Sequence, residues 1–251
     1  MAFGDLVEAV SGNDEGTDSI TLTLTGATAG NLLIFVHFTG NDNTNPPTNF
    51  TQAVAQNDSG NADDLGIHYK IATGGETSIT ATSDDTDDEQ MGILAEFEGP
   101  FDATPLDVTA SNGPTSETTT STGTTGTTAQ ASELAIGAVS MRSLTNVSAW
   151  SNSYTEFGDQ QSTLAKTVAA AYLVLTATGT AETTATHGSA TSMGAIATFK
   201  AAGGGGGVSI GRGLTQGILL ARPSLVGMPH RPLAGTVRPH LIGLDGRKLA
   251  A

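Results

Sequence analysis

The sequence contains one internal repeat, and this repeat limits the folds that the chain can adopt. Three segments of the first half recur in the same order in the second half, at offsets of 102 or 103 residues. Because the register is constant to within one residue over three strand-like segments, we interpret the repeat as an internal duplication with about five strands in each copy. The matched pairs are 32–36 with 134–138, 69–82 with 172–186, and 91–97 with 193–199.

Both copies have the residue patterns of β-strands. Residues 20–24 alternate between apolar side chains and threonine, which is typical of a half-buried strand. Residues 32–38 are apolar without a break except for His37, which favours a central strand. Residues 67–72 and 77–82 flank a Thr-Gly-Gly-Glu turn and predict a hairpin. Glycine, at 32 of 251 positions, suits tight turns between many short strands.

These patterns predict an all-β protein. A five-stranded sheet with one apolar face needs a second face to cover it, and the two copies can cover each other. We therefore predict an antiparallel, jelly-roll-like β-sandwich of about ten strands over residues 1–200, with similar halves at about 5–101 and 122–200. Residues 102–131, rich in Pro, Thr, Gly and Ser, are the expected connector. Two separate small domains are the alternative.

The glycine run that starts at Gly203 separates this body from a tail of different composition. We assign 201–207 to a flexible hinge and 208–251 to an extended basic arm. Arg-Pro pairs followed by leucine and glycine recur three times in the arm, and proline favours extended chain over helix. Each unit offers a guanidinium for carboxylates and a leucine for a small pocket. The arm residues predicted to contact a partner are Arg212, Arg222, Leu225, Arg231, Leu233, Arg238, Leu241, Arg247 and Lys248.

Charge is divided unevenly between body and tail. Residues 201–251 hold six of the ten Lys+Arg and one of the 25 acids, which gives the tail about +5 and the rest about −20. An acidic body repels nucleic acid and anionic membranes, and the arm has no Phe, Tyr or Trp to stack on bases. No apolar stretch approaches the ~18 residues of a membrane span, and the N-terminus does not resemble a signal peptide. We expect no nucleic-acid partner and no membrane.

Patterns that indicate catalysis or metal binding are weak. The acidic run 84–89 could hold Ca²⁺, but it lacks the glycine and distal glutamate of a calcium loop. Residues 57–64 have the same ambiguity, and we interpret both runs as solvated turns that could alternatively receive the basic arm of a sister copy. The Gly-x-Ser-x-Gly spacing occurs at 207–211, but a glycine run and not a predicted strand precedes it, so we predict no nucleophile elbow there. The glycine run also lacks the Lys-Ser/Thr ending of a phosphate loop. With no cysteine either, we predict no enzyme activity, catalytic residue, metal site or cofactor.

Histidines and aromatic residues offer two further candidates. His37 and His68 lie in predicted strands, and we expect each to have one side toward solvent. Neither has a metal-like spacing to another histidine. Trp150, Tyr154 and Phe157 could line a sugar-binding face, although packing in the core is the more common role of such residues.

Several of these segments resemble a known group of proteins. The stretches 29–33, 69–78, 105–108, 133–136 and 194–200 resemble β-sandwich proteins encoded in tailed bacteriophages and prophages, over about residues 5–200. The resemblance implies a structural role in the virion and brings no catalytic residues. Members often carry a tryptophan near the position of Phe50, whereas the tryptophan of this chain is Trp150.

From these observations we expect a non-enzymatic virion structural protein, such as a capsid decoration or cement protein. Its arm would cross neighbouring capsid or tail subunits, or sister copies, and hold the acidic body on the particle. A tail-fibre or surface module that binds host glycans is the alternative. An extracellular bacterial surface protein is a third possibility, which the missing signal peptide disfavours.

Overall fold

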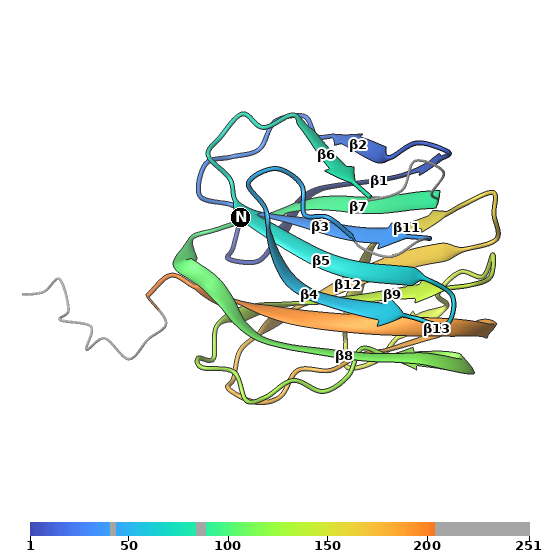
Figure 1. Ribbon diagram of the computed structural model, residues 1–251. Coiled ribbons are helices and arrows are strands. Elements are labelled where there is room, and N and C mark those ends of the chain that lie inside the picture. The colour runs from blue at the N-terminus through green and yellow to red at the C-terminus, as the bar shows by residue number, and fades with distance from the viewer. Residues whose placement is uncertain (41–43, 84–88, 204–251) are drawn as a thin grey trace, which may run out of the picture. The chain divides into compact units, whose positions relative to one another are not determined.

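Antiparallel β-sheets account for the fold in the computed structural model, which describes residues 1–40, 44–83 and 89–203 (Figure 1). The strands of these residues form two large sheets that face each other and one two-stranded sheet. The predicted all-β, antiparallel β-sandwich is thereby confirmed. Nowhere in the described ranges is there a helix long and apolar enough to cross a bilayer.

The two large sheets have related strand orders. The first has the order β1-β7-β3-β5-β4, and the second has the order β13-β9-β12-β11 with β8 and β10 both paired to β13. The first sheet consists of β1 (Leu6–Glu15), β3 (Leu32–Thr39), β4 (Thr51–Asp58), β5 (Asp63–Ile71) and β7 (Glu89–Phe97). The second consists of β8 (Phe101–Ser121), β9 (Glu133–Met141), β10 (Ala149–Trp150), β11 (Thr155–Gln161), β12 (Thr167–Leu175) and β13 (Thr184–Ala201). The small sheet pairs β2 (Ser19–Thr23) with β6 (Ser78–Thr82).

Pairing in the two large sheets matches strand for strand. Leu32 of β3 pairs with Phe97 of β7, and Leu134 of β9 pairs with Phe199 of β13, in both cases 102 residues later. The order β8-β13-β9-β12-β11 thus parallels β1-β7-β3-β5-β4. Each sheet takes its strands from one half of the chain, so consecutive strands do not alternate between the sheets as they do in a jelly roll.

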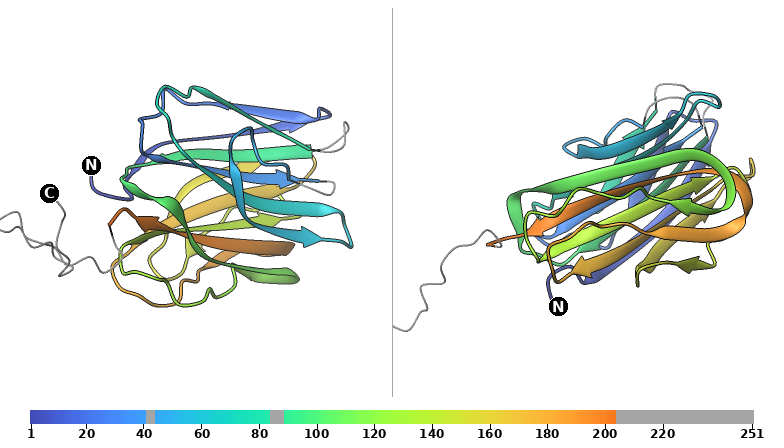
Figure 2. Two further views of the ribbon diagram at one scale, coloured as in Figure 1. Left: turned by 60° about the vertical axis from the view of Figure 1, so that its left-hand side comes forward. Right: turned by 90° about the horizontal axis from the view of Figure 1, so that it is seen from below.

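Strand β8 replaces the connector that we predicted at 102–131. It runs for 21 residues at the edge of the second sheet and pairs with β13 (Figure 2). Its many threonines favour extended backbone, and an edge strand tolerates Pro105 and Pro114 because one side of its backbone has no ladder to complete. Near Pro114 the pairing shifts, since Ser192 faces Thr115 while Gly194 faces Asn112.

The main core lies between the two large sheets. Leu32, Ile34 and Val36 of β3 point toward the second sheet and are fully buried. Ile136 of β9 and Phe199 of β13 belong to the same cluster. A fully buried side chain of this kind stabilises the fold by about 1.5–3 kcal/mol relative to an exposed one. The two halves are therefore held together mainly by side chains.

The outer face of the first sheet is also buried, which explains the unbroken apolar run at 32–38. Leu33 and Phe35 pack against Ile20 and Leu22 of the small sheet. Strand β6 pairs with β2 and not with β5, so the predicted hairpin between 67–72 and 77–82 was wrong. The turn after β5 instead carries the chain to the outer layer.

Candidate functional site

The predicted partner-binding residues lie in 204–251, outside the described residues, and the acidic residues 84–88 lie outside them as well. The arm residues from Arg212 to Lys248 therefore remain a prediction. The described body, however, contains groups of polar side chains that could carry a function, and one of them joins the two large sheets.

Four charged side chains meet between the sheets at one end of the sandwich. Asp63 begins β5 and Glu89 begins β7, whereas Arg142 directly follows β9 and Lys166 directly precedes β12. Lys166 Nζ lies 3.1 Å from Asp63 Oδ1 and 3.2 Å from Glu89 Oε2. Arg142 Nε donates to Asp63 Oδ2 at 2.5 Å, and its Nη2 donates to the carbonyl of Asn61 at 3.0 Å. We call Asp63, Glu89, Arg142 and Lys166 the inter-sheet ion cluster.

Local structure brings Lys166 into this cluster. The main-chain N–H of Ser162 donates to the carbonyl of Lys166, and the N–H of Lys166 donates to the hydroxyl of Ser162, which closes a tight turn before β12. Gly40 leaves room for the ammonium group, because a Cβ there would lie 2.9 Å from Nζ. The same Nζ lies 5.3 Å from the centroid of the Phe38 ring, within the range of a cation–π contact.

The cluster is largely withdrawn from water. The side chains of Asp63 and Glu89 are each 3% exposed and that of Lys166 is 14% exposed. Burial raises the pKa of Glu89, although the charge of Lys166 acts to lower it. Neither Oε1 nor Oε2 of Glu89 has a hydrogen-bond partner, so Lys166 meets Oε2 as an ion pair. Glu89 is thus a buried carboxyl group that can hold a proton beside an amine.

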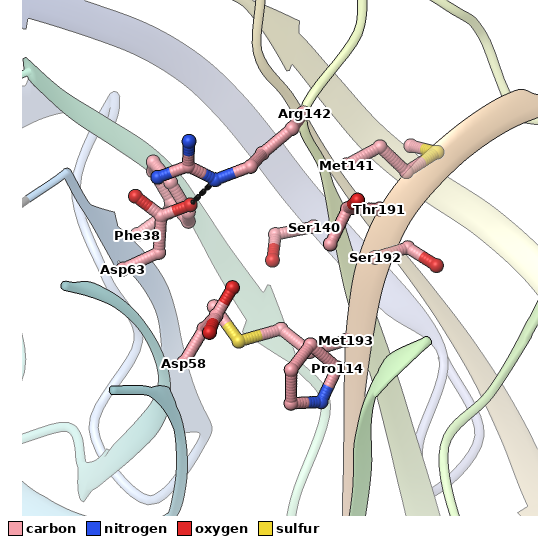
Figure 3. A pocket seen from close by; sticks show the side chains of 10 residues that line it. All are labelled: Phe38, Asp58, Asp63, Pro114, Ser140, Met141, Arg142, Thr191, Ser192 and Met193. Carbon is pink, nitrogen blue, oxygen red and sulfur yellow. Dashed lines mark hydrogen bonds and ion pairs between the residues drawn. The ribbon is translucent and has the colours of Figure 1, made fainter. Parts of the chain in front are cut away.

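A narrow cleft lies beside the Arg142–Asp63 pair (Figure 3). Its cavity volume is about 10 Å³, which is enough for roughly one water molecule and far below the ~300 Å³ of a small-molecule pocket. The cleft is lined by Phe38, Asp58, Asp63, Pro114, Ser140, Met141, Arg142, Thr191, Ser192 and Met193. The cleft therefore leaves little room for solvent or a ligand beside the ion cluster.

The run 57–64 is not the solvated turn that we predicted. Asp58, Asp63 and Asp64 are all buried. Asp64 Oδ2 accepts hydrogen bonds from the main chain and hydroxyl of Thr44 at 2.8 and 2.9 Å, and Asp58 accepts one from the N–H of Gly60. These acids serve the fold because polar groups inside a protein need partners. Among residues 1–40, 44–83 and 89–203, no three side chains are placed to hold a metal ion.

His37 and His68 are also corrected by the structure, because both are fully buried on the outer face of the first sheet. His37 Nε2 lies 2.9 Å from Gln90 Oε1, while His37 Nδ1 and both ring nitrogens of His68 have no partner. Burial lowers the pKa of His37 to about 4 and, with the neighbouring His37, that of His68 to about 3. Both rings are therefore neutral at pH 7. The unbroken apolar run around His37 was the signal that both faces of β3 are covered.

The three aromatic candidates do not share one exposed face. Phe157 belongs to the core between the sheets, with its ring centroid 5.4 Å from that of Phe97. Tyr154 is buried in a separate cluster, and burial raises the pKa of its hydroxyl. Trp150 donates its indole N–H to Glu156 at 2.7 Å. This arrangement is core packing and not a sugar platform.

A second buried carboxyl group lies on the outer face of the second sheet. Glu133 is buried, and burial together with Asp107 raises its pKa to about 7 against a hydrogen bond from Thr198. Glu133 Oε1 accepts from the N–H of Gln130 at 3.3 Å, and Asp107 accepts from the N–H of Ala129 at 2.6 Å. The pair holds the segment around residue 130 against the sheet.

No protein-family model, curated protein or solved structure matches this chain. The inter-sheet ion cluster was not predicted from the sequence. One signal was available: Arg142 and Lys166 are two of the four basic residues before residue 201, and each adjoins a strand-like segment. The sequence before residue 201 contains 24 acidic residues, and without the fold nothing indicates which of them pair with Arg142 and Lys166.

Proposed function

We propose that this chain is a non-enzymatic structural protein of a bacteriophage particle, in the manner of a capsid decoration or cement protein. In this proposal the sandwich is a folded acidic unit, and residues 208–251 attach it to neighbouring capsid or tail subunits or to sister copies. The virion is accordingly the proposed location.

The observation that carries the proposal is the separation of charge between the β-sandwich and the tail. Within the described residues, the chain up to Ala201 forms two large sheets and four apolar clusters. Three of the four body cations, Lys70, Arg142 and Lys166, already pair with buried or half-buried carboxylates. Acids outnumber cations by 24 to 4 before residue 201, and in this proposal that excess of negative charge repels other copies and keeps particles soluble, while the basic arm pairs with carboxylates of its partner.

Deleting residues 203–251 tests the proposal. The truncated protein should stay folded and soluble but should be missing from purified particles produced in its presence. Circular dichroism would report the fold, and mass spectrometry of the particles would report incorporation. A second variant, with Arg222, Arg231 and Arg238 all changed to Ser, should also reduce incorporation. The matched control changes Lys70, a body cation, to Ser. Normal incorporation of the truncated protein would contradict the proposal.

A further inference from the structure

We propose that Lys166 and Asp63 condense to form an amide bond between their side chains, with Glu89 transferring the protons. The product is a covalent link between the two sheets of the sandwich. This inference rests on the inter-sheet ion cluster alone and is independent of the proposed virion function.

The geometry supplies the three groups that such a condensation needs. The nucleophile, Lys166 Nζ, lies 3.1 Å from an oxygen of the Asp63 carboxyl group, which carries the electrophilic carbon. The proton carrier, Glu89, places Oε2 3.2 Å from the same nitrogen. Reacting groups held about 3–3.5 Å apart behave as if they were at very high concentration, which can offset a large part of an activation barrier.

The reaction depends on where the protons are held, and Glu89 is the group placed to hold one beside Lys166. An amine is nucleophilic only without its extra proton, and a carboxyl group loses an oxygen readily only when that oxygen is protonated. The side chains of Asp63 and Glu89 are each 3% exposed. The raised pKa of Glu89 supports a role in holding a proton there.

The atoms balance without any other reactant. Glu89 takes one proton from the ammonium group of Lys166, and the nitrogen lone pair forms a bond to Cγ of Asp63. The bond between Cγ and Oδ1 then breaks, while Oδ1 receives the proton from Glu89 and a second proton from the nitrogen. One water molecule leaves, Glu89 returns to its starting state, and the nitrogen keeps one hydrogen as the amide N–H.

Arg142 is placed to assist this step. Its Nε donates to Asp63 Oδ2 at 2.5 Å, and its Nη2 is held by the carbonyl of Asn61. Oδ2 is the oxygen that becomes negatively charged when the nitrogen adds to Cγ, and a fixed cationic donor there stabilises that charge. The adjoining cleft has room for roughly the one water that is released.

Another ion pair of the body lacks this arrangement and provides a control. Lys70 Nζ lies 2.7 Å from Glu76 Oε1, closer than the distance in the cluster. The Glu76 carboxylate is instead held by donors, since it accepts from the main-chain N–H groups of Thr73 and Gly74. Among the ion pairs of the described residues, Lys70 has no second carboxyl group to carry protons, so we expect no amide there.

The test is the mass of the purified, full-length protein under denaturing conditions. We expect a mass lower than that of the sequence by one water, and a branched peptide that joins residues 63 and 166 after protease digestion. Fragment sequencing is essential, because a succinimide at Asp245-Gly246 would cause the same mass loss in a linear peptide. The full sequence mass, or a loss located only at Asp245, would overturn the proposal.

Substitutions assign the roles. Lys166→Arg keeps the charge but should abolish the branched peptide, whereas the control Lys70→Arg should leave it unchanged. Glu89→Gln should slow formation of the amide by about 100-fold or more, as expected for loss of a general acid–base. Formation at the unaltered rate in Glu89→Gln would exclude Glu89 as the proton carrier. If a variant does not fold, the mass of the unaltered protein still decides the matter.

Discussion

The inner and outer faces of the first sheet bury polar groups at the same end of the sandwich but in opposite ways. On the inner face, Asp63 and Glu89 are charge-paired with cations from the second sheet. On the outer face, His37 and His68 have three ring nitrogens without partners and stay neutral. Alternation along a strand sends successive residues to opposite faces. The same sheet therefore buries ion pairs on its inner face and neutral histidines on its outer face.

Removing the shared cation should have the largest effect on stability. In protein that has not formed the proposed amide, Lys166→Met leaves Glu89 without its positive partner and Asp63 with one of two. Breaking a buried ion pair from one side typically costs about 3–5 kcal/mol, and we expect a loss of that order in the free energy of unfolding measured with urea. Lys70→Met is the control, because a single pair nearer the surface contributes about 1 kcal/mol or less. Equal losses of unfolding free energy in the two variants would show that the inter-sheet ion cluster contributes no more than the Lys70–Glu76 pair.

Lowering the pH should reduce the free energy of unfolding through the two buried histidines of the outer face. The unfolded histidines take up protons below about pH 6.5, whereas the folded pKa values are about 4 for His37 and about 3 for His68. The stability that the two neutral histidines contribute is therefore fully present above about pH 6.5. It is lost as the pH falls toward the folded pKa values of about 4 and about 3. By linkage the loss reaches on the order of 3 kcal/mol per buried histidine.

The measurement is the free energy of unfolding against pH for the natural protein and for the double variant His37→Gln, His68→Gln. The variant should be flatter between pH 6.5 and 4. Glu133, whose raised pKa of about 7 acts with the opposite sign, is present in both proteins and cancels in the difference. His187→Gln is the control, because both of its ring nitrogens have partners. Parallel curves would show that the histidines do not set the acid response.

Space is tight around the buried histidines of the outer face, and Gly66→Ala measures how tight. A Cβ at Gly66 would lie 2.4 Å from Thr44 Oγ1 and 2.7 Å from His68 Nε2. Overpacking of this kind costs about 1–3 kcal/mol, which a shift in the urea midpoint would report. Gly126→Ala is the matched control, since its Cβ would meet Val108 at an ordinary 3.8 Å. An unchanged midpoint in Gly66→Ala would mean that the cluster adapts at little cost.

Exposed polar contacts should matter least. Thr21 and Thr80 share a hydrogen bond of 2.8 Å between their hydroxyl groups on the solvent side of the small sheet. Thr80→Val removes the hydroxyl but keeps a β-branched side chain, and we expect a change of about 0.5 kcal/mol or less in thermal or urea unfolding. A loss of stability comparable to that of Lys166→Met would show that solvent exposure does not determine how much these contacts stabilise the fold.

The repeat was enough to predict the two-layer architecture, because matched apolar segments at constant register imply matched sheets. The strand at 101–121 was missed because its threonines and prolines are typical of linkers, and its role as an edge strand depends on its pairing with β13. The partner of β6 was missed because local turn chemistry does not say to which layer a strand goes. The ion cluster depends on contacts between residues about 80–100 positions apart, which no local pattern encodes.

The two residues that we propose to be joined occupy equivalent places in the two halves. Leu32 pairs with Ile71 and Leu134 pairs with Val174, so β12 follows β5 by 103 residues, and Lys166 follows Asp63 by the same interval. In a dimer of two identical half-length chains, this place would put like charges face to face across the symmetry axis. A duplicated chain can instead place an acid in one copy and an amine in the other. The proposed amide can therefore form in the duplicated protein but not in a symmetric dimer of identical half-length chains.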